Sequence, residues 1–432
     1  MSDKSTLALV LASALLDGDW SPRSINRQAR KVLGSRPKWL RKVLQRIGEQ
    51  FPQAPLGGRD ELAAALLRAG LSNRDDEYRP ISPRRFSLEP TRMGSRRWPV
   101  PRLSTVGDLA GFLEVDLSLL ERLADRKGLG RSVRDEPLRN YRYRWFPKKS
   151  GGCRLLEVPK PRLRAAQRKV LHGILDLIPP HALAHGFAPG RNLLGFVRPH
   201  CGRALLLRLD LESFFSSVTA GRVFGIFRTA GYPEEVARTL TAICTNRTPA
   251  AVLAAAPPEL ARSSGERWRT LKKLEAPHLP QGAPTSPALA NLTAYRMDVR
   301  LAAAAANAGA LYTRYADDLA FSFDDDSARR ASRFHLLAAG IAMDEGFSLQ
   351  FRKTRFARRG TAQRLGGLTI NEHPNVPRRE VDLLRATLHR ATREGPAELD
   401  RARLLGRITW VEQANPSRSK KLRALFDQIA WD

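Results

Sequence analysis

The sequence predicts a mixed protein of the α+β class that is preceded by a helical extension. Apolar residues recur at helical spacing over residues 5–70, with basic residues on the opposite faces. Strand-like and helix-like segments alternate from residue 141 onward, and amphipathic helical patterns return after residue 375. These patterns predict four regions: N-terminal helices over 1–70, a linker over 71–103, a mixed core over 104–375 and C-terminal helices over 376–432.

The composition describes a globular protein with a large positive charge. Hydrophobic residues make up 42% and charged residues 27% of the 432 residues, which fits a folded chain of two or three domains. Lys and Arg total 73 against 43 acidic residues, so the net charge is +30. This excess predicts a polyanionic partner, with nucleic acid favoured over a ribosomal, membrane-surface or polyphosphate partner.

Cysteine use and hydropathy indicate a cytoplasmic protein. Cys153, Cys201 and Cys244 are too widely separated for a zinc motif or a disulfide framework. No run of about 18 apolar residues is present, so neither a transmembrane helix nor a membrane partner is expected. The apolar segment at 5–16 has no basic leader, and it is predicted to be a core helix rather than a signal peptide.

Caps and periodicity set the helices of the first region. Ser21 is a predicted N-cap, with Pro22 at the first helical position. The opposite, basic faces of these helices are either solvated or contact nucleic acid. The residues predicted to face the core are Ile25, Ala29, Val32, Trp39, Leu40, Val43, Leu44 and Ile47, and the basic residues are Arg27, Arg30, Lys31, Lys38, Arg41, Lys42 and Arg46.

The second region, 71–103, is rich in Pro, Arg and Ser and has no apolar periodicity, which predicts a linker. A new helical pattern then begins, with Ser104 or Thr105 as the expected N-cap. The alternation of strands and helices that follows 141 predicts the mixed core.

Two adjacent aspartates interrupt a strand-forming run at 311–323. Asp317 and Asp318 fit the tip of a tight hairpin, and they equally fit a metal site, since a hairpin tip holds carboxylates on a stiff support. Two carboxylates at close range repel each other unless a cation compensates their charge. The metal interpretation therefore requires a further carboxylate in a similar setting.

That carboxylate is Asp210, at the end of the short apolar run 205–209. Taken alone, Asp210 could be an N-cap of the next helix. A strand-end aspartate together with a hairpin pair instead predicts a two-metal phosphoryl-transfer site. The expected cofactor is Mg²⁺, as two ions, with Mn²⁺ as a substitute, because carboxylate and phosphate oxygens are hard ligands.

Ordered motifs in the mixed core resemble those of reverse transcriptases. They are LDLESFF at 209–215, LPQGAPTSPALANL at 279–292, YADD at 315–318 and FRKTRF at 351–356, and their order and spacing match over roughly 140–375. Three further segments resemble bacterial retron reverse transcriptases more than retroviral ones; they lie at 147–171, 184–196 and 365–391. The resemblance implies a right-hand polymerase, with fingers and palm over 104–375 and a thumb over 376–432.

The resemblance also implies a role for each motif residue. Asp210, Asp317 and Asp318 would be catalytic and would hold the metal ions. The backbone carbonyl of Leu211 would be a further metal ligand. Phe215 would exclude ribonucleotides by crowding the 2′-hydroxyl, although one of Phe214 and Phe215 is expected to belong to the core. The other nucleotide-binding residues would be Lys149, Arg154, Gln281, Gly282 and Lys353.

The resemblance also implies that the C-terminal helices bind nucleic acid. Two motifs, at 196–200 and 365–367, depart from the retron pattern. The retron Asn-Ala-x-x-His motif reads Phe196-Val197-x-x-His200, and the expected Val-Thr-Gly reads Leu365–Gly367. These departures concern the RNA that is recognised, not the polymerase core. The residues implied to bind nucleic acid are His200, Arg378, Arg379, Arg385 and Arg390.

The expected function is RNA-directed DNA synthesis on the protein's own structured non-coding RNA, giving single-stranded DNA (msDNA) in a retron antiviral defence system. Expected partners are that RNA and its DNA product, dNTPs, a toxin or effector protein and a separate RNase H, since only about 80 residues follow Lys353. Two alternatives remain open: another defence-associated or group II intron-like reverse transcriptase, and a catalytically idle RNA-binding scaffold. The intact aspartates argue against the scaffold.

Overall fold

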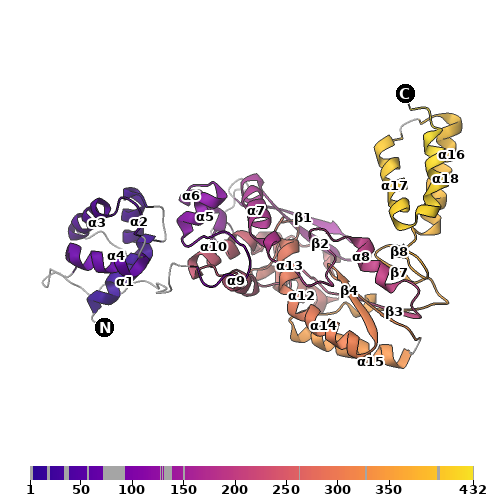
Figure 1. Ribbon diagram of the computed structural model, residues 1–432, viewed down its shortest axis with the longest axis horizontal. Coiled ribbons are helices and arrows are strands. Elements are labelled where there is room, and N and C mark those ends of the chain that lie inside the picture. The colour runs from indigo at the N-terminus through magenta and orange to yellow at the C-terminus, as the bar shows by residue number, and fades with distance from the viewer. Residues whose placement is uncertain are drawn as a thin grey trace. The chain divides into compact units, whose positions relative to one another are not determined.

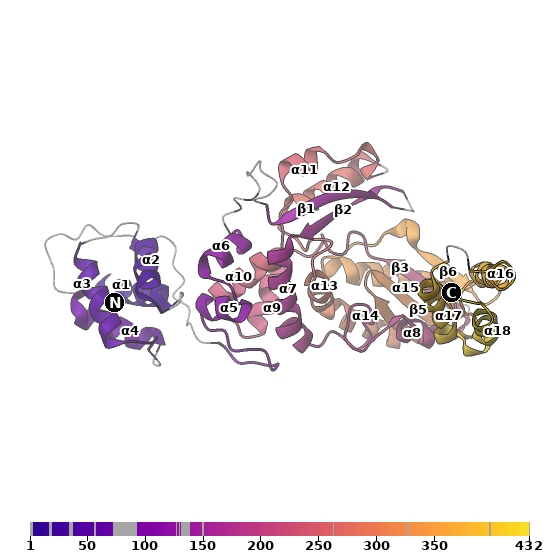
Figure 2. The ribbon, with the colours of Figure 1, turned by 90° about the horizontal axis from the view of Figure 1, so that it is seen from above.

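The structure is a computed structural model (Figures 1 and 2), and the chain divides into two compact units. Unit 1 comprises Met1–Ile178 and Val218–Leu289, and unit 2 comprises Pro179–Ser217 and Ala290–Asp432. Most of the predicted linker lies outside the described residues, and the four predicted regions remain predictions. The described residues are 3–16, 20–33, 38–55, 58–71, 93–126, 128, 130, 139–148, 151–261, 263–325, 328–396 and 399–431.

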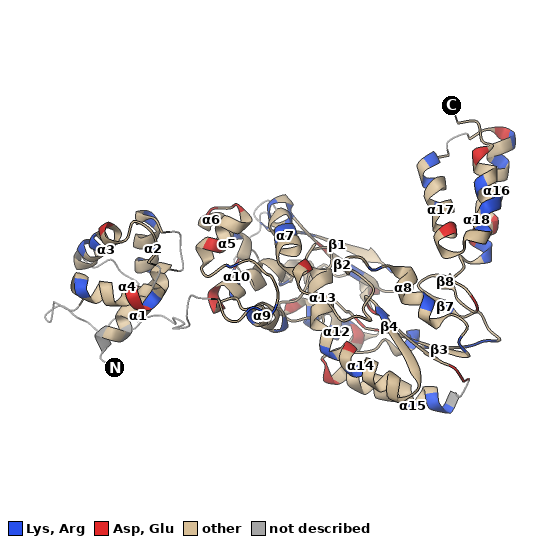
Figure 3. Cartoon of the chain, in the orientation of Figure 1, with Lys and Arg blue, Asp and Glu red and all other residues tan. Residues whose placement is uncertain are grey.

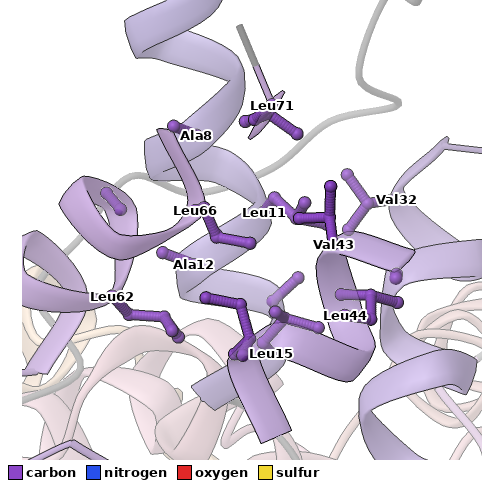
Figure 4. Packing of buried hydrophobic residues seen from close by; sticks show 14 of the residues in the cluster. Ala8, Leu11, Ala12, Leu15, Val32, Val43, Leu44, Leu62, Leu66 and Leu71 are labelled. Atoms are coloured by element: carbon purple, nitrogen blue, oxygen red, sulfur yellow. The ribbon is translucent and has the colours of Figure 1, made fainter. Parts of the chain in front are cut away.

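The first helices of unit 1 enclose a hydrophobic core of their own (Figure 4). The predicted cap is confirmed, since the Ser24 N–H donates to Ser21 Oγ at 3.2 Å. The residues predicted to face the core in the helices at 22–33 and 38–50 are buried, except for Trp39, which is partly buried and packs against the cluster. The elements are α1 (Asp3–Leu16), α2 (Pro22–Leu33), α3 (Lys38–Gln50), α4 (Gly58–Leu66) and the turn η1 (Leu67–Leu71).

The rest of unit 1 combines helices with one antiparallel hairpin, in which β1 pairs with β2. Thr105 is the N-cap of α5, and it forms a reciprocal capping box with Asp108. The elements are α5 (Val106–Leu113), α6 (Leu117–Ala124), β1 (Tyr141–Pro147), β2 (Cys153–Pro159), α7 (Pro161–Gly173), η4 (Leu175–Leu177), α9 (Ala220–Thr229), α10 (Glu234–Cys244), α11 (Ala250–Ala254), η6 (Pro258–Leu260) and α12 (Ser264–Glu275). Helix α13 (Ser286–Thr293) leads from unit 1 into unit 2.

Unit 2 is built on a four-stranded antiparallel sheet with the strand order β4-β5-β3-β6. The strands β3 and β5 lie in the centre, and their residues are almost all buried, which explains their nearly continuous apolar sequence. The elements are α8 (Leu193–Val197), η5 (Arg198–His200), β3 (Leu205–Asp210), α14 (Tyr295–Asn307), β4 (Ala310–Tyr315), β5 (Asp318–Phe323), α15 (Ala328–Asp344), η7 (Phe351–Lys353), β6 (Arg355–Arg358), β7 (Arg364–Leu365) and β8 (Leu368–Thr369).

The two faces of this sheet have different neighbours. On one face, Phe321 stacks on Tyr312 and packs edge-on against Phe334 of α15, and α14 packs against β4. On the other face, Leu206 and Ala320 join a hydrophobic cluster with Phe196 of α8. Because side chains alternate along a strand, Asp210 and Asp318 share the second face with Leu206 and Ala320.

Three helices follow the sheet in unit 2, and they extend the same hydrophobic cluster. Leu384 and Leu388 of α16, Ile408 of α17 and Phe426 of α18 are buried in it. In the part of the chain that the structure describes, none of the helices has both the length and the apolar character needed to cross a bilayer. These last helices are α16 (Arg378–Glu394), α17 (Arg401–Ala414) and α18 (Pro416–Asp427).

Candidate active site

Two of the predicted aspartates face each other across neighbouring strands. Asp210 is the last residue of β3 and pairs in register with Asp318, the first residue of β5. The backbone of Asp210 is fixed further by the Gln350 N–H, which donates to its carbonyl oxygen at 2.8 Å. The strand-end position predicted for Asp210 is therefore confirmed.

Asp317 lies in the tight turn between β4 and β5, as the hairpin interpretation predicted. The turn needs a left-handed residue, and Ala316 provides it with φ +55°. The Leu211 N–H donates to the carbonyl oxygen of Asp317 at 2.9 Å, which ties the turn to the end of β3. These contacts bring all three aspartates to one edge of the sheet.

The three carboxylates influence one another's protonation. Burial, followed by the negative charges of Asp210 and Asp318, raises the pKa of Asp317 to about 6. Burial also raises the pKa of Asp210, although a hydrogen bond from Lys353 opposes the change. Asp317 is thus the carboxylate whose negative charge is least compensated by the protein.

Two basic side chains compensate the other two carboxylates. Lys353 Nζ lies 2.8 Å from each carboxylate oxygen of Asp210. Arg208 of β3 donates to Asp318 Oδ1 from Nε at 3.1 Å and from a terminal nitrogen at 2.7 Å. The structure places Lys353 in the short turn η7. No role was assigned to Arg208 from the sequence.

A buried arginine that sequence reasoning missed anchors the hairpin. Arg314 of β4 has no exposed surface, and its guanidinium makes two hydrogen bonds to Asp298, at 2.7 and 2.8 Å. The same guanidinium also donates to Asn291 Oδ1 at 2.8 Å and to the carbonyl oxygen of Ala316 at 3.0 Å. Because a buried guanidinium needs such partners, this network fixes the turn that carries Asp317. The sequence did contain a signal for this pair. Arg314 lies two residues before the turn at 316–317, and Asp298 lies in the helical segment that precedes the strand.

The two candidate phenylalanines separate clearly. Phe214 is buried at 4% exposure and packs against Phe347, so it is the core residue. Phe215 is only half-buried, and its ring lies 6.2 Å from that of Phe187, which is itself exposed. Of the two rings, Phe215 is therefore the one that is open to a ligand.

The remaining predicted nucleotide-binding residues belong to unit 1. Arg154 is exposed on β2, opposite Phe146 of β1. Gln281 and Gly282 form a loop held against β2, where the carbonyl oxygen of Gln281 accepts a hydrogen bond from the Glu157 N–H at 2.8 Å. Lys149 lies outside the described residues.

His200 does not occupy the position that sequence reasoning gave it. Its side chain has no exposed surface, and its ring nitrogens lie 2.7 Å from Ser322 Oγ and 2.8 Å from Thr313 Oγ1. Burial lowers the pKa of His200 to about 3, so the ring is neutral. Direct contact of His200 with nucleic acid is therefore contradicted, and the residue instead joins strands β4 and β5.

The two segments that depart from the retron pattern pack against each other. Phe196, Val197 and Leu365 are all fully buried in the same hydrophobic cluster. A Cβ atom added at Gly366 would lie 2.6 Å from Leu193 Cδ1 and 3.3 Å from Val197 Cγ1. The close approach of α8 to the β7–β8 turn thus depends on a glycine at this position.

The four predicted arginines of the C-terminal region are exposed on α16, where basic residues recur along the helix (Figure 3). Arg378 and Arg385 pair with Asp382. Arg390 and Arg393 have no ion-pair partner among the described residues. They line a surface hollow of about 490 Å³, whose other lining residues are Asp382, Arg385, Ala386, His389, Glu394 and Leu425. The positive charge of Arg390 and Arg393 is therefore available to a partner.

The donor set at the sheet edge suits a hard cation. It consists of carboxylate and backbone oxygens. The raised pKa of Asp317 reflects burial first and then the negative charges of Asp210 and Asp318, which a cation would compensate. In the described parts of the chain, no three His, Cys, Asp or Glu side chains already form a metal cage. Lys353 and Arg208 hold Asp210 and Asp318 in the arrangement observed.

The chain is similar to known proteins over most of its length. Residues 146–386 match the family described as "Reverse transcriptase (RNA-dependent DNA polymerase)". The retron Mx65 reverse transcriptase of Myxococcus xanthus is 37% identical over 369 residues, which cover 83% of this chain and 78% of that protein. The retron Mx162 enzyme of the same organism is 34% identical over 66% of this chain and 60% of its own length. The retron Ec86 reverse transcriptase of Escherichia coli is 30% identical over 67% of this chain and 81% of that protein.

Proposed function

Because the chain belongs to the retron-type reverse transcriptases and is an RNA-directed DNA polymerase, we propose that it copies a structured non-coding RNA into single-stranded DNA. The observation that carries the proposal is the edge of the unit 2 sheet, where Asp210, Asp317 and Asp318 come together. Its test is the extension of an oligo(dT) primer on poly(rA) with dTTP and Mg²⁺. An RNA-binding scaffold without activity would bind the template and not extend the primer.

The proposed catalytic role of each residue follows from its surroundings. Asp210 and Asp317 would be the main metal ligands, with Asp318 and the carbonyl of Leu211 assisting. Two Mg²⁺ ions, or Mn²⁺ in their place, would supply charge stabilisation for the attacking 3′-hydroxyl and the leaving pyrophosphate. Lys353 would leave Asp210 and bind the phosphates of the nucleotide, since its side chain is 47% exposed and can reach solvent. In this proposal the unit 2 sheet is the palm, the β1–β2 hairpin belongs to the fingers and α16–α18 form the thumb.

Arg208 offers a test of the metal proposal that does not depend on catalysis. In Arg208→Gln, Asp318 would lose its ion pair beside Asp210, so without metal the protein should be less stable by about 1–2 kcal/mol. Mg²⁺ should recover most of this loss, because the cation would replace the missing charge. Thermal unfolding in EDTA and in Mg²⁺ measures both effects.

The matched control for Arg208 is Arg126→Gln. Arg126 also makes two hydrogen bonds to one carboxylate, Glu235, but it belongs to unit 1. Its substitution should show no recovery by Mg²⁺. Equal behaviour of the two variants would contradict a metal site at Asp318.

We further propose that the C-terminal helices bind the structured RNA through Arg390 and Arg393. The double substitution of both residues by Gln should weaken RNA binding and reduce the salt slope of log K by about 1–2, because fewer counterions are released from phosphates. Filter binding or fluorescence anisotropy at several salt concentrations provides the measurement.

Arg378→Gln with Arg379→Gln is the control for this pair, since both residues are exposed on the same helix and neither lines the hollow. This control should change RNA affinity less. An equal loss in the two double variants would favour a general basic surface over a defined RNA contact.

The N-terminal helices are proposed to be a second, less specific clamp on RNA. They have a separate hydrophobic core and expose basic residues on α2 and α3, among them Arg27, Arg30 and Arg41. Deletion of residues 1–95 should leave primer extension on poly(rA) intact and weaken binding of the native RNA. If the truncated protein bound that RNA with the same affinity and salt slope, docking of a partner protein would become the better explanation.

The biological setting is proposed from the relatives' names. Three relatives are retron reverse transcriptases, so the product is proposed to be msDNA, made in an antiviral defence system with an effector protein and a separate RNase H. Sequencing the RNA and DNA that copurify with the protein tests this proposal. A covalently linked or paired RNA–DNA product from a neighbouring non-coding RNA would support it, and intron RNA would favour the group II intron-like alternative.

A further inference from the structure

A buried charged cluster in unit 1 lies directly behind the Gln281–Gly282 loop. Its centre is Glu157 of β2, whose side chain is 1% exposed. Three side chains donate hydrogen bonds to the Glu157 carboxylate: His278 Nε2 at 2.8 Å, Asn246 Nδ2 at 2.9 Å and Thr248 Oγ1 at 2.9 Å. None of these residues was assigned a role from the sequence.

The geometry favours a positive charge on His278. Its Nε2 faces the Glu157 carboxylate, and its Nδ1 lies 2.7 Å from the carbonyl oxygen of Ala276. A carboxylate at Glu157 and the carbonyl of Ala276 are both acceptors, and a charged His278 donates to both of them. Burial alone would lower the pKa of His278, but the charge and hydrogen bond of Glu157 and the bond to Ala276 outweigh it and raise the pKa.

The same two residues hold the backbone of the loop. The His278 backbone exchanges two hydrogen bonds of 2.9 Å with Asn246, so the segment is fixed where the loop begins. Glu157 contacts the loop with its own backbone as well: its N–H donates to Gln281, and a Cβ atom at Gly282 would lie 3.0 Å from its carbonyl oxygen. Gly282 has φ +128°, a conformation that suits glycine. Side chain and backbone of Glu157 thus fix both ends of the segment 278–282.

We propose that Glu157 and His278 are positioning residues that set the Gln281–Gly282 loop for binding of the incoming deoxynucleotide. The inference rests on the proposed role of that loop in nucleotide binding. A loop held by a buried ion pair keeps its geometry without the nucleotide, so the loop loses less conformational entropy when the nucleotide binds. Loss of the pair should therefore raise the KM for dNTP, while primer–template affinity stays unchanged.

The test compares Glu157→Gln, His278→Gln and the double variant in steady-state primer extension. Each single variant should raise the KM for dTTP by about tenfold with a smaller change in kcat. The double variant should lose less than the product of the two single effects, because two neutral amides can again hydrogen-bond to each other. His172→Gln is the control, since His172 is an exposed residue of unit 1 paired with Asp176.

The pH dependence of KM gives a readout that a merely structural role would not share. Since the folded pKa of His278 is raised, the contribution of the pair is complete below the ordinary histidine value and is lost as pH rises through the raised value. Three titratable neighbours of the pair among the described residues are Tyr141, Tyr143 and Cys244, and burial raises their pKa values above the ordinary values. The KM of the native enzyme should rise with pH, and that of Glu157→Gln should not.

The outcomes separate the two proposals. No extension by the native protein would overturn the proposed function. Extension with an unchanged KM in both single variants, or a KM of the native enzyme that does not depend on pH, would overturn the positioning role alone. If Glu157→Gln fails to fold, Thr248→Val removes one hydrogen bond to Glu157 with a side chain of similar shape, and it should raise KM by about two- to threefold.

Discussion

Replacing Asp317 by Asn should lower the rate of DNA synthesis by at least about a thousandfold, with RNA binding retained. The amide cannot carry the negative charge that a cation requires, and no other carboxylate occupies the turn between β4 and β5. Asp210→Asn should have a similar effect. Single-turnover primer extension at saturating dNTP, with RNA binding measured in parallel, is the appropriate measurement.

Although Asp317→Asn should abolish synthesis, it should stabilise the folded protein when no metal is bound. The pKa of Asp317 is raised to about 6, so ionisation destabilises the folded state progressively as pH rises from about 3.8 to about 6. Asp317→Asn removes this penalty and should raise the Tm in EDTA at pH 7, although it abolishes synthesis. The control is Asp344→Asn, an exposed carboxylate paired with Arg300, which should change neither quantity. Synthesis by Asp317→Asn at the native rate would end the two-metal proposal.

Phe215→Ala should reduce discrimination against ribonucleotides by about a hundredfold. Phe215 is half-buried beside the exposed Phe187, so its ring is open to a ligand. In its proposed role, this ring contacts the sugar of the incoming nucleotide. Removing the ring leaves room for a 2′-hydroxyl. The ratio of kcat/KM for dTTP and UTP on poly(rA) is the quantity to measure, and the KM for dTTP should change little.

Phe214 provides the internal control for this experiment. Its ring is 4% exposed and packs against Phe347. Phe214→Leu should lower the free energy of unfolding by about 1–3 kcal/mol without changing the choice of sugar. Altered discrimination in Phe214→Leu, with none in Phe215→Ala, would show that the other ring excludes ribonucleotides.

Local patterns predicted the parts of the site that depend on neighbouring residues in the chain. The apolar run ending at Asp210 predicted a strand, and the paired aspartates predicted a hairpin turn. The caps at Ser21 and Thr105 follow from the same kind of local rule, in which a short polar side chain accepts a backbone hydrogen bond. The order of the motifs then predicted the family without any knowledge of the packing.

The parts that sequence reasoning missed depend on contacts between distant residues. Arg208 meets Asp318 across 110 positions, and Lys353 meets Asp210 across 143 positions. Periodicity gives no information on such pairs, since either cation could equally have been solvated. The error at His200 has the same origin: a motif assigned it to RNA, whereas its hydroxyl partners on β4 and β5 become visible only in the folded sheet.

The contact between α8 and the β7–β8 turn bears on how this enzyme can be recombined with its relatives. Phe196 and Val197 lie about 170 positions before Leu365 and Gly366 in the chain, yet the two segments share one hydrophobic cluster. A chimera with a single crossover between them would join one parent's helix to the other parent's turn, and would leave either a steric clash or a cavity. Exchanging both segments together keeps the parental packing. A library of hybrid enzymes should therefore take these two distant segments from the same parent.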